Sequence, residues 1–182
     1  MTKTIILCFL FTAFVVSEIF SQNMMTKNAF IGFYSKTSFE NIKAENNQVY
    51  ALLNPATHQL AFAVLLKGFL FPKELMQEHF NENYVESDRY PKATFSGSCA
   101  GDMQLDKEGV YQVIIKGILT LHGVAQPLET PARLEVKKDR IVGTASFNVM
   151  PEKYNISIPG IVREKIAKEI NVQIQTTWMR TN

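Results

Sequence analysis

The chain has 182 residues, of which 46% are hydrophobic and 20% are charged, and its formal net charge is +2. This composition excludes a disordered tail, a collagen-like repeat and a membrane protein with several spans. Nineteen basic residues against seventeen acidic ones leave no surplus for contacting phosphates, so we expect no nucleic-acid partner. The length fits one domain.

The N-terminus carries an uncharged apolar run over residues 5–16, directly after Lys3 and Thr4. The run is shorter than the roughly 20 residues that a membrane-spanning helix needs. A basic start, a short apolar stretch and a polar end together predict a secretory signal peptide over residues 1–21, cut after Ser21. We therefore expect a periplasmic or secreted protein with its domain over residues 22–182. A buried helix or an uncleaved anchor remain the alternatives for the run.

Alternation of apolar and polar residues dominates the rest of the chain and predicts about eight strands. It is clearest over residues 170–178, where Ile170, Val172 and Ile174 share one face with Trp178. Further strands are expected at 31–39, 49–53, 59–66, 93–99, 111–119, 132–137 and 141–149, with turns at 54–57 and 138–139. Because eight strands need closed edges, we expect an all-β fold with short helices, an eight-stranded antiparallel barrel.

Two segments interrupt this alternation. After Pro72, apolar residues recur at three- and four-residue spacing, which predicts a helix over 73–84. A shorter helix is expected from Gly160 to about Lys168, with Ile161 and Ile166 on its apolar side. Both helices are expected to cover ends of the barrel. Between the strands and the first helix, residues 69–71 (Phe-Leu-Phe) are interpreted as core under that helix, or as an edge of the opening that touches a membrane or a lipid tail.

The faces expected to point into the barrel mix large apolar residues with small ones. An eight-stranded barrel can be filled by its own side chains or can hold one small ligand, and the residues leave both alternatives open. A hollow barrel with this lining favours an acyl or isoprenoid chain, since each buried methylene gains about 0.8 kcal/mol. A filled barrel would suit a structural or protein-interaction module of the cell envelope. The predicted lumen lining is Phe33, Phe62, Val64, Leu66, Phe95, Tyr111, Val113, Ile115, Gly117, Phe147 and Trp178.

The polar and thiol side chains do not form the pattern of an enzyme or a metal site. The sequence has no Gly-x-Ser-x-Gly, paired-carboxylate or phosphate-loop motif, and His79 lacks a second histidine four residues later. We therefore expect no catalysis, no metal and no cofactor. His122 is expected to hydrogen-bond backbone in its turn, with a polar contact to a ligand as the alternative. Cys99 is expected to be a buried small hydrophobe, and an enzymatic hypothesis would depend on one of these two residues.

Three segments resemble the YceI-like family of exported lipid-binding proteins. Residues 90–95, 117–124 and 141–147 follow its Y-P-x-A-x-F, G-x-L-T-L-H-G-V and L-x-G-x-x-x-F patterns, with Ile141 in place of the leucine. The likeness covers about residues 28–180. It implies a lipocalin-like barrel whose lumen holds a long isoprenoid or fatty chain, in the periplasm or outside the cell. Residues 35–40 and 65–84 depart from the family's commonest pattern, so the resemblance assigns no head-group contacts. Contact with a membrane surface stays open, and the sequence makes no prediction of oligomeric state.

Overall fold

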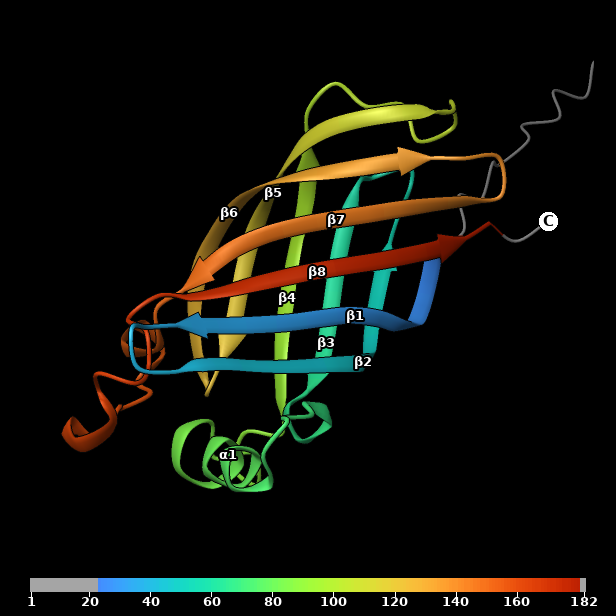
Figure 1. The fold of residues 1–182 in the computed structure, drawn as a ribbon. Coiled ribbons are helices and arrows are strands. Elements are labelled where there is room, and N and C mark those ends of the chain that lie inside the picture. The colour runs from blue at the N-terminus through green and yellow to red at the C-terminus, as the bar shows by residue number, and fades with distance from the viewer. Residues whose placement is uncertain (1–22, 181–182) are drawn as a thin grey trace, which may run out of the picture.

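Eight antiparallel strands, built on the period-two alternation, close into one barrel in the computed structural model, which describes residues 23–180. The predicted signal peptide lies outside the described residues. Each strand pairs with its neighbours in sequence, and β8 returns to pair with β1 (Figure 1). The strands are β1 (Met24–Lys36), β2 (Asn41–Leu53), β3 (Gln59–Leu65), β4 (Lys92–Ala100), β5 (Gly109–Leu121), β6 (Val124–Val136), β7 (Arg140–Val149) and β8 (Ile170–Met179). The expected all-β barrel with short helices is confirmed.

The first two strands are longer than expected, and the turn between them begins earlier than the sequence pattern predicts. Register shifts between Thr26 and Ile31 break the alternation in β1, which explains why the pattern did not predict its first half. The first half of β2 was missed because residues 41–48 are mostly polar. The expected strand over 31–39 ends at Lys36. Thr37 Oγ1 instead accepts hydrogen bonds from the backbone N–H groups of Phe39 and Glu40, at 3.2 and 3.1 Å, and Phe39 is exposed.

The first half of β6 was also missed, because it contains Pro127 and Pro131. Proline is confined to strand positions where its missing N–H is not needed. Residues 124–131 pair with β5 alone, since the pairing of β6 with β7 begins at Ala132. One side of this stretch is therefore a free edge that tolerates proline.

The helix expected over 73–84 is present as α1 (Glu74–His79) followed by a wider π-helical turn, η2 (Phe80–Tyr84). The second expected helix is wrong: η4 (Gly160–Val162) is a single 3-10 turn, and Ile161 is 92% exposed. A short helix is marginal unless an apolar face packs, and Ile161 packs against nothing that would support one. Two further 3-10 turns are η1 (Leu66–Gly68) and η3 (Pro151–Tyr154).

The two ends of the barrel differ. At one end Trp178 is 1% exposed, its Nε1 donates a hydrogen bond to the Ala51 carbonyl oxygen at 3.1 Å, and Leu53 and Ile141 are fully buried. The opposite end is surrounded by the β1–β2, β3–β4 and β7–β8 connections, which include α1 and η4 (Figure 1). Among the described residues, no helix has the length and apolar character to span a bilayer.

Candidate functional site

A cavity of about 510 Å³ occupies the barrel. Its volume lies within the range of about 300–1,000 Å³ typical of small-molecule sites. All eight strands contribute to its walls, together with the β3–β4 and β7–β8 connections at the end of the barrel that carries α1. The described barrel is therefore hollow, which decides between the two alternatives that the sequence left open.

Seven of the eleven predicted lumen residues line this cavity: Phe33, Phe62, Val64, Phe95, Ile115, Phe147 and Trp178. The other four do not. Val113 and Tyr111 lie in the half of β5 toward the closed end, where Val113 is buried in the core and Tyr111 Oη donates a hydrogen bond to the Lys107 carbonyl oxygen at 3.0 Å. Leu66 follows the end of β3 and is buried in η1.

Gly117 is the fourth exception, because neighbouring atoms occupy the place of its missing side chain. Gly117 pairs with Gly97 across β4 and β5. A Cβ at Gly117 would lie 2.6 Å from the Gly97 Cα and 2.6 Å from Phe95 Cζ, and closer still to the Ser96 carbonyl oxygen. The backbones of the two strands and the Phe95 ring therefore occupy the space that side chains at Gly97 and Gly117 would fill.

An aromatic cluster that the strand pattern did not predict covers part of the cavity. The Phe33 ring lies 5.1, 5.6 and 5.4 Å, between centroids, from the rings of Phe69, Phe71 and Phe80. Phe69 is buried, Phe71 and Phe80 line the cavity, and Leu70 between the first two is exposed. Phe69 and Phe71 therefore pack in the core against Phe80, as one of the two interpretations had it. Both also line the cavity, so contact with a lipid tail stays a prediction. The alternation of inward and outward residues over 69–71 was the available signal.

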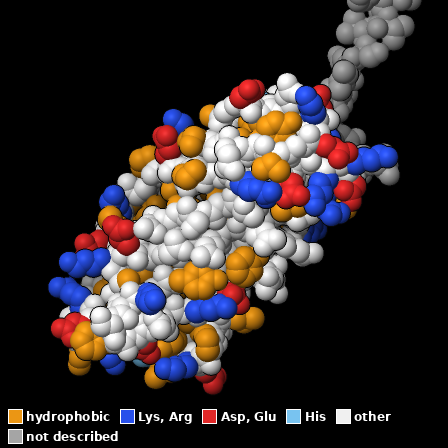
Figure 2. Space-filling view, turned by 45° about the horizontal axis from the view of Figure 1, so that its top comes forward, with side chains coloured by type: hydrophobic (Ala, Val, Ile, Leu, Met, Phe, Trp, Pro, Cys, Tyr) orange, Lys and Arg blue, Asp and Glu red, His pale blue; other side chains and the backbone are white. Residues whose placement is uncertain are grey.

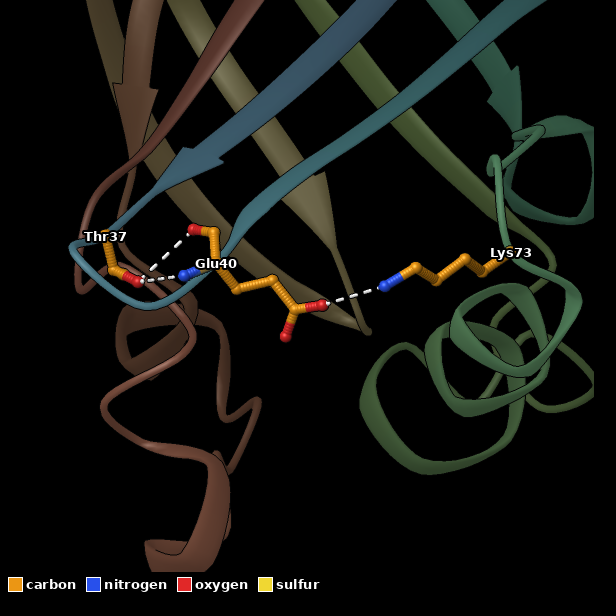
Figure 3. A network of polar contacts seen from close by, with 3 residues as sticks. All are labelled: Thr37, Glu40 and Lys73. Carbon is orange, nitrogen blue, oxygen red and sulfur yellow. Dashed lines mark hydrogen bonds and ion pairs between the residues drawn. The ribbon is translucent and has the colours of Figure 1, made fainter.

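Charged side chains that line the cavity lie on the connections around its mouth. Lys73 Nζ forms an ion pair with Glu40 Oε1 at 3.3 Å, which joins the β1–β2 turn to the start of α1 (Figure 3). Lys165, on the β7–β8 connection, also lines the cavity. Deeper, apolar side chains predominate, and Thr176 Oγ1 is buried without a hydrogen-bond partner among the described residues. An apolar interior with charges at one opening suits an amphiphile.

His122 lies outside the cavity lining and connects three loops at the mouth end. Its Nδ1 is 3.0 Å from the Tyr154 carbonyl oxygen, its Nε2 is 3.2 Å from Glu86 Oε1, and its ring packs edge-on against Tyr90 at 4.5 Å. With φ values of 51° and 73°, His122 and Gly123 form the tight turn between β5 and β6. Backbone hydrogen bonding by His122 was expected, but its partner is 32 residues away.

Two observations bear on the other chemical candidates. Burial raises the pKa of the Cys99 thiol to about 11, so the reactive thiolate is scarce at neutral pH. Within residues 23–180, no cluster of three or more His, Cys, Asp or Glu side chains is arranged to hold a metal ion.

Comparisons with known proteins agree with this architecture. A polyisoprenoid-binding domain from Saccharophagus degradans superimposes with a TM-score of 0.72 at 12% identity, covering 87% of this chain and 98% of that one. BcnA from Burkholderia cenocepacia gives 0.69 at 13% identity, covering 84% and 96%, and a YceI protein from Campylobacter jejuni gives 0.64 at 16%, covering 79% and 87%. At such identities the likeness concerns the fold.

No curated protein sequence matches the chain significantly. The family model described as YceI-like domain matches residues 20–178, which is most of the chain. The match includes the three segments that suggested this family and all eight strands except the last residue of β8. The chain therefore belongs to the YceI-like family.

Proposed function

We propose that this protein holds one isoprenoid or fatty-acyl chain in its barrel, as a carrier or sequestering protein outside the cytoplasm, without a catalytic step. The observation that carries the proposal is the cavity itself, which is apolar in its depth, closed near Trp178 and bordered by charged residues only at its mouth. The Saccharophagus degradans neighbour is described as polyisoprenoid-binding, which supports the ligand class.

The free energy of binding would come mainly from the apolar walls. Each methylene moved from water into such a site gains about 0.8 kcal/mol, so a chain of about ten carbons gains enough to offset the cost of association. Lys73, Glu40 and Lys165 would contact the polar end of the ligand at the mouth. The length and shape of the cavity would then select the chain, and the mouth would select the head.

The ligand is tested by native mass spectrometry and organic extraction of the purified protein, together with binding of the fluorescent apolar probe N-phenyl-1-naphthylamine. Ala145 lines the cavity from β7, so Ala145→Phe fills part of it. We expect this variant to lose co-purified lipid and to bind the probe at least about tenfold more weakly. Ala125→Phe is the matched control, because Ala125 is exposed and makes no part of the cavity lining.

Two results would contradict the proposal. The first is a wild-type protein that carries no lipid and binds no probe. The second is an Ala145→Phe variant that binds as tightly as the Ala125→Phe control. Export is tested separately: cell fractionation and an intact-mass measurement of the recovered protein should find it outside the cytoplasm, beginning at Gln22.

A further inference from the structure

Three large apolar side chains project into solvent at the mouth of the cavity. Phe39, Leu75 and Ile161 are 69, 60 and 92% exposed, and they lie on the β1–β2 turn, on α1 and on η4. We call these three residues the mouth rim. Single exposed apolar residues are ordinary, but three on separate segments around one opening call for a physical explanation.

Each residue of the mouth rim either lines the cavity itself or directly precedes a residue that does. Leu75 both lines the cavity and reaches solvent. Phe39 precedes Glu40, and Ile161 precedes Val162, and both of these neighbours line the cavity. The inward residues of the turns thus form the mouth, while the outward ones point away from the protein.

One of the three segments is positively charged. Residues 161–168, which begin at Ile161, contain Arg163, Lys165 and Lys168 against Glu164, whereas α1 carries Glu74 and Glu78. Figure 2 shows hydrophobic side chains among both basic and acidic ones at the lower-left end of the molecule, which is the end that carries η4 in Figure 1. Apolar tips among basic residues are the composition of surfaces that insert into the boundary of a bilayer.

We propose that the mouth rim is a docking surface for a lipid bilayer. This inference rests on the proposed function, because the guest of an apolar cavity is itself stored in membranes. Docked through Phe39, Leu75 and Ile161, the mouth would face the acyl region, so a lipid chain could move between bilayer and cavity without crossing water. Lys73 and Lys165 at the same opening would then lie at the level of the lipid head groups.

The test is co-sedimentation with vesicles of phosphatidylethanolamine and phosphatidylglycerol (7:3), using the full chain in the form that the cell produces. We expect the double variant Phe39→Ser/Ile161→Ser to bind vesicles at least about tenfold more weakly than the wild type. Val110→Ser/Met179→Ser is the matched control, because both residues are 55% exposed but lie where β5 begins and β8 ends, at the opposite end of the barrel. The control should bind vesicles like the wild type.

Lipid uptake is measured in parallel, so that the two proposals fail separately. The rim variant should still bind N-phenyl-1-naphthylamine from water with unchanged affinity, while its uptake of lipid from vesicles becomes slower. Equal vesicle binding by rim variant, control and wild type would overturn the docking surface even if the probe binds. If the rim variant loses a dimer but binds vesicles as the wild type does, the rim contacts a second copy of the chain. That result would also overturn the docking surface. Probe binding that fails in every variant would instead refute the proposed function.

Discussion

The pairing of Gly97 with Gly117 sets how closely β4 and β5 approach, and Gly97→Ala tests it. A Cβ at Gly97 would lie 2.8 Å from the Gly117 Cα and 2.7 Å from Phe95 Cζ, and closer still to the carbonyl oxygen of Lys116. Two of these three atoms belong to the backbone, so no side-chain rotation relieves the contact. The two strands have to separate where they are paired.

The size of the effect follows from the bonds that this separation strains. A net contribution of about 0.5–1.5 kcal/mol for each hydrogen bond, over two or three bonds beside the pair, gives a loss of about 1–4.5 kcal/mol. Unfolding free energies are about 5–15 kcal/mol, so this is a large fraction. For a domain of this size it lowers the melting temperature by about 10 °C.

The assay is thermal and urea unfolding followed by circular dichroism, with two other glycines as graded controls. At Gly143 a Cβ would meet side-chain atoms of Trp178, Thr176 and Leu134 at 3.0, 3.1 and 3.3 Å, which can move, so we expect a smaller loss. At Gly160 nothing lies within 4 Å, and Gly160→Ala should stay within about 0.5 kcal/mol of the wild type. A Gly97→Ala protein that unfolds together with Gly160→Ala would refute the reasoning.

Three further predictions concern the mouth and the buried thiol. His122→Asn keeps a residue that tolerates positive φ but loses the contact with the Tyr154 carbonyl oxygen, so urea unfolding should show a loss of about 1–3 kcal/mol; an unchanged midpoint would contradict this. Lys73→Met removes a largely exposed ion pair and should change the unfolding free energy by less than about 1 kcal/mol, whereas a larger loss would mean that the pair with Glu40 holds the mouth together. Because burial raises the pKa of Cys99 to about 11, iodoacetamide at pH 8 should label this thiol slowly in the folded protein and fully only in denaturant; complete native labelling within minutes would show that β4 opens.

Period-two alternation was sufficient to predict the barrel, because burial on one face of each strand is a local property of the sequence. It placed Phe62, Val64 and Trp178 on the inward face, where the structure has them. It failed where the local rule is broken by long-range pairing. The register shifts in β1 and the prolines on the free edge of β6 are tolerated only because of which strands lie beside them.

Alternation also predicts which face of a strand points inward, but not which of the inward residues line the cavity. Val113 and Ile115 share the inward face of β5, yet only Ile115 lines the cavity, whereas Val113 is buried in the core. The sequence likewise predicted a helix over 73–84 but not that Phe69, Phe71 and Phe80 would meet Phe33.

The sequence by itself determined an apolar, inward-facing wall and the family to which the chain belongs. Only the tertiary structure decided that the barrel is hollow, because volume depends on how closely strands and rings approach. Gly117 illustrates the difference, since a missing side chain leaves space only if no backbone or ring moves into it, and here Gly97 and Phe95 do.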